Sequence, residues 1–359
     1  MKVAVVQNRD FSGVINAFGQ ASPEVYGLKT IQMVVEALLR QGHEVRICEG
    51  DCNLLSNLAL FMPCADGQPA GMVFNMAYGV QGECRYTHVP AMLEMAGVPY
   101  TGSSPLGHAL ALDKVVTKDL IRQAGVPTPN YSVMRRAGES CEGLRFPLVV
   151  KPRHESTSFG LHLVHDRDEL GRAVETVVAQ YRQYALVEEY IDGREVCVAL
   201  LGNEEMEFLP LVEQDFGERG SHLITWDDKT HKSAVEPRKI CPAVVPVALA
   251  ERLREISLAT FRACHCKDFA RVDIRVDAAG NPYVLEINSM ASLGGGGSYV
   301  LAALAAGYSF AALINRILDV AHQRYFGTRA GREDCDLDHV SAPYALEATK
   351  SPSSSSRNE

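Results

Sequence analysis

The sequence has no long apolar stretch, and this absence speaks against a membrane protein. No run approaches the roughly 18 consecutive apolar residues that a membrane-spanning helix needs. The opening residues, MKVAVVQNRD, contain an apolar run too short for the core of a signal peptide, and no cleavage site follows it. We therefore expect a cytoplasmic protein without a membrane partner.

Blocks of lysine and arginine are also absent, and the net charge is −9. A chain with this charge balance is not expected to have nucleic acid or an anionic membrane as its main partner. Any polyanion would have to bind in a local basic pocket.

The ten cysteines form no regular framework. Scattered cysteines indicate reduced thiols in a cytoplasm rather than the disulfides of a small secreted domain. The segment Cys264-His265-Cys266 could suggest a metal site, but no second ligand pair stands at metal-site spacing. We do not expect zinc there.

What the chain does have is the length and composition of a globular protein with two or three packed subdomains: 359 residues, 47% hydrophobic and 22% charged. In the N-terminal part, strands are expected over 3–7, 43–50 and 71–79, and helices over 25–41 and 87–96. Alternating strands and helices predict an α/β layer with a parallel sheet, which ends near Ser104.

In the rest of the chain, several of the expected strands are joined by short turns. Helices are expected over 109–125, 245–263 and 309–324. A strand that ends in a polar loop is expected over 146–160, two strands joined by a short turn over 185–202, one strand over 208–216, and two strands over 269–288. The AAGN segment predicts a hairpin turn inside the last of these. Residues 217–236 are expected to form a loop, and the Ser-rich end is expected to be disordered. The predicted domains are 1–104, 105–190 and 191–328, followed by a tail over 329–359.

Two carboxylates and an amide occur on the two arms of that hairpin. Asp273 lies on one arm, whereas Glu286 and Asn288 share a face of the other, because side chains alternate with period two. Oxygen ligands of this kind suit Mg²⁺. A half-polar hairpin exposed to solvent would show the same pattern, so the motif alone leaves both interpretations open.

Lys151 ends a run of apolar strand residues, where a lysine is costly unless it has a partner. The next segment, HESTSFG (154–160), offers hydroxyls, backbone N–H groups and a glycine, which together can hold a phosphate. The GxxxxGK[ST] and GxGxxG motifs are both absent. An ordinary Ser/Thr-rich loop remains the alternative.

The segment VEEYIDGRE (187–195) carries acids at two separated places. A strand whose backbone meets an adenine edge, followed by an acid for the ribose hydroxyls, would have this pattern. A solvated acidic edge strand would have it too.

These motifs together resemble those of the ATP-grasp ligases. Lys114, VVKP (149–152), VEEYIDGRE, RVD (271–273) and EIN (286–288) occur in the order and spacing of that superfamily. Within it, residues 1–325 are similar to the D-alanine–D-alanine ligases, and 98–131 resembles the start of their central domain. The resemblance implies a chain of α/β and α+β class, with an ATP-grasp fold preceded by an N-terminal parallel-sheet domain.

The resemblance also implies how ATP and magnesium would be held. Lys114 and Lys151 correspond to the two lysines that touch the phosphates, and Asp273, Glu286 and Asn288 correspond to the metal ligands. The remaining nucleotide contacts are expected from Glu155, Thr157, Ser158, Glu188, Glu189, Ile191 and Glu195. Two Mg²⁺ ions are expected, with Mn²⁺ as an alternative.

Three residues correspond to catalytic positions of these ligases. Arg271 matches the arginine that stabilises a tetrahedral intermediate. Lys229 resembles the lysine that closes on the terminal phosphate. Glu24 resembles the glutamate that anchors the amino group of the first amino acid.

The implied reaction joins two small molecules, a carboxylate and an amine. The carboxylate takes the γ-phosphoryl group of ATP and becomes an acyl phosphate, and the amine then displaces phosphate to form an amide. Because an acyl phosphate hydrolyses in water, the loop over 217–236 is expected to close over the site. The family is often dimeric, so a homodimer is an open expectation.

The chain departs from the family around the substrates. The family's HGxxGEDG segment here is YGVQGECR (78–85), so that Tyr78 stands for a histidine and Arg85 for a glycine, whereas Glu83 is retained. After Asn288 the chain continues SMASLGGGGSY, and its four glycines remove bulk from the acceptor side and add backbone N–H groups. Substrate contacts are expected from Tyr78, Glu83, Gly295, Gly296, Ser298 and Tyr299.

These departures leave three functions open. The first hypothesis is a ligase of specialised metabolism with an altered acceptor pocket, which takes an amine larger than D-alanine. The alternatives are a true D-alanine–D-alanine ligase of cell-wall synthesis and an ATP-grasp kinase that releases a phosphorylated product. A non-catalytic nucleotide-binding module would not need the complete set of lysines and acids.

Overall fold

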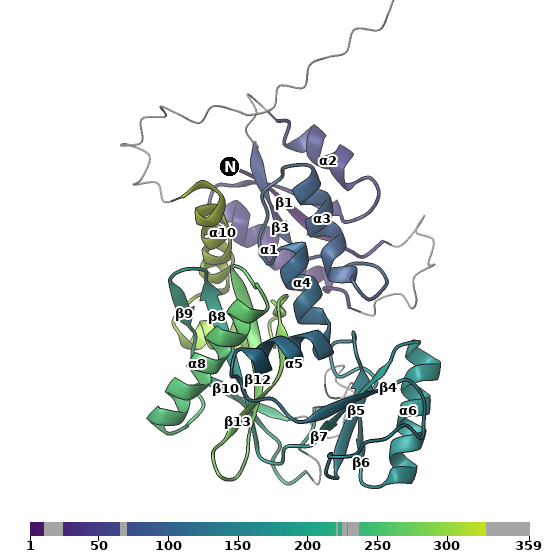
Figure 1. The fold of residues 1–359 in the computed structure, drawn as a ribbon. Helices are drawn as coiled ribbons and strands as arrows, with labels where there is room; N and C mark the ends of the chain where they lie inside the picture. Colours follow the sequence, from purple (N-terminus) through teal and green to yellow (C-terminus); the bar gives the residue numbers. More distant parts are fainter. Residues whose placement is uncertain (11–23, 65–69, 220–221, 225–227, 229–236, 328–359) are drawn as a thin grey trace, which may run out of the picture. The chain divides into compact units, whose positions relative to one another are not determined.

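The computed structural model describes residues 1–10, 24–64, 70–219, 222–224, 228 and 237–327. Three sheets organise these residues, and helices connect and cover them (Figure 1). All three sheets belong to one compact unit, Met1–Tyr325. The domain boundaries at 104, 190 and 328 stay predictions.

The first sheet is parallel, as the sequence predicts, and has the strand order β2-β1-β3. Its strands are β1 Lys2–Gln7, β2 Glu44–Glu49 and β3 Gly71–Asn75, and its helices are α1 Leu28–Arg40, α2 Leu54–Phe61 and α3 His88–Met95. α2 and α3 pack against the face of β1 that carries Ala4 and Val6. The short helix α2 was not predicted, because it is apolar on almost every side and lacks a helical period.

The single helix predicted over 109–125 is wrong. The chain forms α4 (Pro105–Leu112) and α5 (Lys114–Gln123), with a break at Asp113. The Asp113 backbone is extended, and its carboxylate accepts hydrogen bonds from two backbone N–H groups of α5 at 3.0 and 3.2 Å. An aspartate in this position satisfies donors that the helix itself leaves unpaired. The break makes Lys114 the first residue of α5.

Replacing Asp113 by alanine is expected to lower the free energy of unfolding by about 1–2 kcal/mol, because the cap of α5 is lost. The same carboxylate also binds Arg153, whose Nε and Nη2 lie 2.7 and 2.6 Å from its oxygens. Asp113→Asn keeps an oxygen for the cap and is expected to cost less. Urea unfolding measures both variants, and equal losses would show that capping is not the cause.

The second sheet has the antiparallel order β4-β7-β5-β6. Its strands are β4 Tyr131–Met134, β5 Leu148–Pro152, β6 His162–Val164 and β7 Ala185–Glu189, and α6 Arg167–Tyr181 packs on one face. Leu148 and Val150 of β5 belong to the core beneath α6. Because side chains alternate, Lys151 of β5 and Glu188 of β7 lie on the opposite face.

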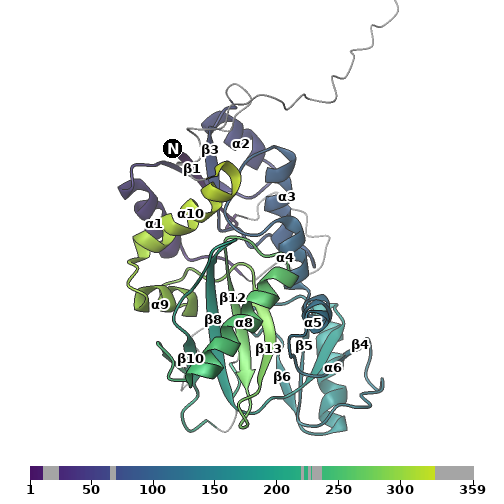
Figure 2. The ribbon, with the colours of Figure 1, turned by 60° about the vertical axis from the view of Figure 1, so that its left-hand side comes forward.

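The third sheet has the order β11-β10-β8-β12-β13, and β9 pairs with β8. Figure 2 shows β8, β12 and β13 beside one another. Its strands are β8 Arg194–Gly202, β9 Met206–Phe208, β10 Val212–Asp215, β11 Arg238–Ile240, β12 Phe269–Val276 and β13 Pro282–Asn288. One face packs against α8 (Val247–Ala263) through residues such as Val198 and Val272. The hairpin predicted over 269–288 is confirmed as β12 and β13.

This hairpin contains a bulge that was not predicted from the sequence. Asp273 pairs with Glu286, but the next pair is Ile274 with Val284, so Leu285 is the extra residue. A bulge redirects side chains on the longer strand. Leu285 and Glu286 consequently both line a cavity, whereas Val284 lies in the core.

Two helices complete the described chain, α9 Ser298–Ala305 and α10 Phe310–Phe326. The second was predicted and the first was not. No single described helix is long and apolar enough to cross a membrane; α9 and α10 reach that length and composition only as a pair, which is bent by 101°.

Candidate functional site

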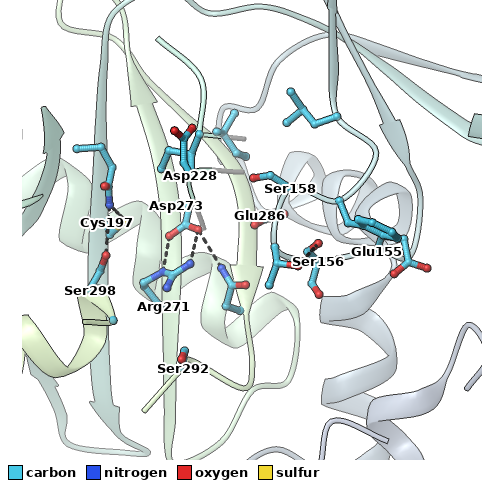
Figure 3. Close-up of a pocket in the computed structure, with 18 of the residues that line it drawn as sticks. Glu155, Ser156, Ser158, Cys197, Asp228, Arg271, Asp273, Glu286, Ser292 and Ser298 are labelled. Atoms are coloured by element: carbon cyan, nitrogen blue, oxygen red, sulfur yellow. Dashed lines mark hydrogen bonds and ion pairs between the residues drawn. The ribbon is translucent and has the colours of Figure 1, made fainter. Parts of the chain in front are cut away.

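A cavity of about 800 Å³ is lined by residues of the second and third sheets and by segments that belong to the N-terminal part of the chain but not to the strands of the first sheet. The contributing segments are Glu24–Gly27 and Tyr86 near the first sheet, β5, β7 and the loop 155–159 of the second, and β8, β10, β12, β13 and the loop 292–297 of the third. Figure 3 shows Arg271, Asp273 and Glu286 on the strands of one wall, and Ser156 and Ser158 on the loop of another. Two polar faces of separate sheets therefore meet at this cavity.

Two lysines share the buried carboxylate of Glu188. Lys151 forms an ion pair with it, and Lys118 Nζ lies 2.8 Å from its Oε2. Burial lowers the pKa of Lys118 to about 8, although Glu188 acts in the opposite direction. Burial also lowers the pKa of Lys151, but Glu188 and Glu286 raise it more, so that the pKa lies above its usual value. Lys151 is therefore held as a cation on the cavity wall.

A third lysine, Lys114, reaches the cavity from the first turn of α5. Its Nζ donates to the backbone carbonyl of Glu155 and lies 3.7 Å from Glu286 Oε2. Burial lowers the pKa of Lys114, and Glu286 opposes this effect. Lys114 and Lys151 together give the cavity two buried amino groups, which suit a polyanion such as a phosphate chain.

The loop after β5 has a backbone that favours anions. Thr157 and Ser158 have φ values of 54° and 59°, in the left-handed region, and both line the cavity. Successive residues in such conformations turn their N–H groups into concave anion sites. Gly160 has a φ of 75°, and a Cβ there would lie 2.7–2.9 Å from Tyr181 and Pro152, so this close turn needs glycine.

The oxygen-rich side of the cavity is formed by β12 and β13. Arg271 Nε and Nη2 donate to the two oxygens of Asp273 at 2.7 and 2.8 Å, and Asn288 Nδ2 donates to Asp273 Oδ2 at 3.0 Å. Burial lowers the pKa of Arg271, but Asp273 raises it more, so the guanidinium stays charged. Glu286 lies opposite Asp273 in the strand pairing.

These oxygen atoms fit a hard cation by their chemistry. Two carboxylates and an amide oxygen belong to the ligand types that Mg²⁺ takes. Among the described residues, no group of three or more His, Cys, Asp or Glu side chains is gathered as for a metal ion. Phosphate oxygens or water would therefore have to complete the coordination of any metal ion at this hairpin.

The end of the cavity nearest the first sheet is built from tyrosines and a glutamate. Tyr26 and Tyr78 are stacked at 4.9 Å between ring centroids, and Tyr86 lies 5.6 Å from Tyr78. Glu24 Oε2 accepts hydrogen bonds from Tyr86 OH at 2.7 Å and from Arg85 Nη2 at 3.1 Å. The carboxylate is thus held by two side chains of one short segment.

The glycine loop forms another part of the wall. Gly294 to Gly297 all line the cavity, together with Ser298. Lys239 Nζ donates to the carbonyl of Gly296 at 2.5 Å, and Gln214 Nε2 donates to Ser298 Oγ at 3.2 Å. The loop is therefore tied to the third sheet by polar side chains.

Most of the predicted site residues meet at this cavity. The structure places on its wall Glu24, Tyr78, Lys114, Lys151, Glu155, Thr157, Ser158, Glu188, Glu189, Ile191, Glu195, Arg271, Asp273, Glu286, Asn288, Gly295, Gly296 and Ser298. Lys229 and most of the loop 217–236 lie outside the described residues.

Two predicted substrate residues lie elsewhere. Glu83 is exposed on the segment before the short helix 85–87. Tyr299 is fully buried, its hydroxyl donates to the carbonyl of Leu200 at 3.0 Å, and its ring packs against Phe269. Because α9 begins at Ser298, the Tyr299 side chain turns into the core instead of the cavity.

The sequence analysis missed several residues of the site. Lys118 was not selected, although it follows Lys114 by one helical turn and so shares its face. Tyr26, Tyr86 and Lys239 gave no motif of their own. Their contribution depends on segments that meet only in the folded chain.

Proteins with similar sequences cover most of this chain. The family model described as "D-ala D-ala ligase C-terminus" matches residues 120–319. The chain is 59% identical over 333 residues to the uncharacterized protein y4sG of Sinorhizobium fredii, covering 91% of this chain and 98% of that protein. It is 33% identical over 244 residues to the D-alanine–D-alanine ligase of Pelotomaculum thermopropionicum, covering 65% of this chain and 75% of the ligase.

A solved structure has the same fold. The crystal structure of D-alanine–D-alanine ligase from Bacillus anthracis complexed with ATP superimposes with a TM-score of 0.70 and 24% identity, covering 90% of this chain and 98% of that one. This similarity confirms the ATP-grasp fold that the sequence predicts.

Proposed function

The chain belongs to the D-alanine–D-alanine ligase family of ADP-forming ATP-grasp C–N ligases, and we propose that it joins a carboxylic acid to an amine larger than D-alanine. We place this reaction in specialised metabolism rather than in cell-wall synthesis. The proposal combines the arrangement of the nucleotide side of the cavity with the unusual composition of the acceptor side.

The main observation in support of a ligase activity is that lysine side chains and oxygen-bearing side chains line the same cavity. Lys114 and Lys151 supply positive charge from the helix and strand on one side. Asp273, Glu286 and Asn288 supply oxygen atoms from the hairpin on the other. A triphosphate with its counter-ions requires both, because its charge must be balanced and its metal coordinated.

ATP would supply the phosphoryl group that makes the acid reactive, and Mg²⁺ would neutralise charge on that group. We propose that Asp273, Glu286 and Asn288 hold two Mg²⁺ ions, that Mn²⁺ can replace them, and that Lys114 and Lys151 bind the phosphates. Thr157 and Ser158 would contribute to the phosphate side, with the backbone described above. Glu188, Glu189, Ile191 and Glu195 line the part of the cavity that would receive the nucleoside.

The proposed reaction conserves atoms in two steps. An oxygen of the acid bonds to the terminal phosphorus as ADP leaves; the amine nitrogen then bonds to the acyl carbon as phosphate leaves and the nitrogen loses a proton. We propose that Arg271, held by Asp273, supplies the guanidinium that stabilises the oxyanion of the second step. We propose that Lys229 closes on the terminal phosphate, as the family resemblance implies.

The four glycines support the proposal that the pocket accepts an amine larger than D-alanine. The φ values of Gly294 to Gly297 all lie outside the left-handed region, so the backbone conformation does not require glycine there. A Cβ at Gly295 or Gly296 would have no neighbouring heavy atom within 4 Å. Since neither conformation nor packing explains these two glycines, we attribute them to space for a substrate.

A panel of acids and amines tests the proposal. Purified protein is incubated with ATP, Mg²⁺ and pairs of acids and amines, while ADP, phosphate and the amide product are measured. We expect amide formation with an amine larger than D-alanine. Strong turnover with D-alanine as both substrates would contradict the altered acceptor, and a stable phosphorylated acid without amide would indicate a kinase.

A further inference from the structure

Arg85 forms a buried ion pair with Glu24, the carboxylate at the tyrosine end of the cavity. Its side chain is 3% exposed and that of Glu24 is 7% exposed, so solvent screens this ion pair little. The guanidinium also donates to the carbonyl of His154 at 3.0 Å and to Glu155 Oε2 at 3.4 Å. Three acceptor groups therefore hold the Arg85 guanidinium in place, and its contact with Glu24 is buried.

Glu24 itself lines the cavity and would meet the substrate. A cavity carboxylate ordinarily attracts an ammonium group, but Glu24 Oε2 already accepts from Arg85 and from Tyr86 OH. A substrate ammonium bound there would compete with the guanidinium for one carboxylate and be repelled by it. The second carboxylate nearby, that of Glu155, is engaged by Arg85 and by Gln183 Nε2 at 2.7 Å.

The aromatic rings offer little compensation for a cationic group. Tyr26 covers one face of Tyr78. The Arg85 guanidinium carbon lies 5.3 Å from the centroid of Tyr86, within cation–π distance. The side chains of Tyr26, Tyr78 and Tyr86 line the cavity beside Glu24, and their rings and hydroxyls suit an uncharged group.

We propose that Arg85 makes this end of the cavity select a carboxylic acid whose α-substituent is uncharged, such as a hydroxyl or an N-acyl group, over a free amino acid. This inference rests on the proposed ligase function. It replaces the role first expected for Glu24, the anchoring of an α-amino group. Arg85 acts through Glu24 and is a positioning residue, whereas Glu24 and Tyr86 would contact the substrate.

Matched acids test the selection directly. Full-length protein, ATP and Mg²⁺ are incubated with hydroxylamine, which traps an acyl phosphate as a hydroxamate whatever the natural amine is. The pairs are alanine with lactate and phenylalanine with phenyllactate, each as both enantiomers, together with N-acetylalanine. We expect kcat/KM for the uncharged analogues to exceed that for the amino acids by at least about tenfold.

Two variants separate charge from fold. Arg85→Met is expected to shift the preference toward the amino acids by about tenfold or more, mainly through KM, whereas Arg85→Lys keeps the positive charge and the original preference. Thermal unfolding checks that both variants are folded. Should Arg85→Met not fold, the preference of the unchanged protein decides the question.

The outcomes distinguish this inference from the proposed function. Hydroxamate from amino acids in preference to their uncharged analogues would overturn the role of Arg85 and leave the ligase function standing. An equal effect of Arg85→Met on both members of each pair would also overturn it. Absence of ADP and hydroxamate with every acid would overturn the ligase function and, with it, this inference.

Discussion

Replacing Glu286 by glutamine is expected to lower kcat by about a hundred- to a thousandfold, because the proposed Mg²⁺ site loses a carboxylate and Mg²⁺ would balance charge on the transferred phosphoryl group. Glu286 faces the cavity, pairs with Asp273 across the hairpin and lies 3.7 Å from Lys114 Nζ. The side chain is 21% exposed and glutamine keeps its size, but the substitution also removes a counter-charge of Lys114, whose side chain is only 8% exposed. ADP formation is measured with the most active acid–amine pair.

A second measurement links the loss of activity to the metal. The Mg²⁺ concentration at half-maximal rate is expected to rise in Glu286→Gln, and binding of an ATP analogue to weaken in the presence of Mg²⁺. The matched control is Glu213→Gln on β10, whose carboxylate pairs with Arg194 at 2.6 Å. We expect the control to keep kcat within about twofold, since this pair is partly exposed. A Glu286→Gln variant as active as the control would contradict the assignment.

Replacing Glu188 by leucine is expected to lower the free energy of unfolding by about 3–5 kcal/mol, because two buried lysines lose their shared counter-charge. Lys118 has no exposed side-chain surface, and Lys151 is only 9% exposed. Without the carboxylate, burial would lower the pKa of Lys118 below its present value of about 8. Urea unfolding at pH 7 measures the effect.

The neighbouring residue provides a control of the same type. Glu189, the next residue of β7, pairs with Arg145, whose side chain is 85% exposed. Glu189→Gln is expected to cost only a small fraction of the Glu188→Leu effect, since the charge of Arg145 stays in contact with water and glutamine keeps an acceptor oxygen. Removing both partners, in Lys118→Met with Glu188→Leu, is expected to recover at least about 1 kcal/mol relative to Glu188→Leu alone. Equal losses from Glu188→Leu and Glu189→Gln would contradict the buried-cluster explanation.

The helix break at Asp113 shows how local chemistry and periodicity compete in the sequence. The apolar spacing of 109–125 satisfies a single helix, but an aspartate followed by donors without acceptors also forms a helix cap. The sequence contains both the apolar spacing of one long helix and the cap at Asp113, and the folded chain forms the cap. The result matters for the site, because it brings the Lys114 side chain to the start of α5 beside Glu155 and Glu286.

The sequence by itself determined the polar faces of the sheets. A strand alternates with period two, so Glu286 and Asn288 had to share a face, and so did Arg271 and Asp273. The order of these motifs along the chain was sufficient to indicate the ATP-grasp family, which the comparisons confirm. The face of a strand on which a side chain lies depends on residues only a few positions away, so it can be predicted from the sequence.

Only the tertiary structure decided which of these faces meet and what each side chain binds. Arg85 and Glu24 are 61 positions apart and pair because the short helix 85–87 and the segment before α1 lie side by side in the folded chain. The bulge at Leu285 and the start of α9 at Ser298 each redirect side chains, sending Leu285 to the cavity and Tyr299 to the core. A shift of one residue reverses the direction of a side chain in a strand and turns it by about 100° in a helix, at almost no local cost, so packing between distant segments makes the choice.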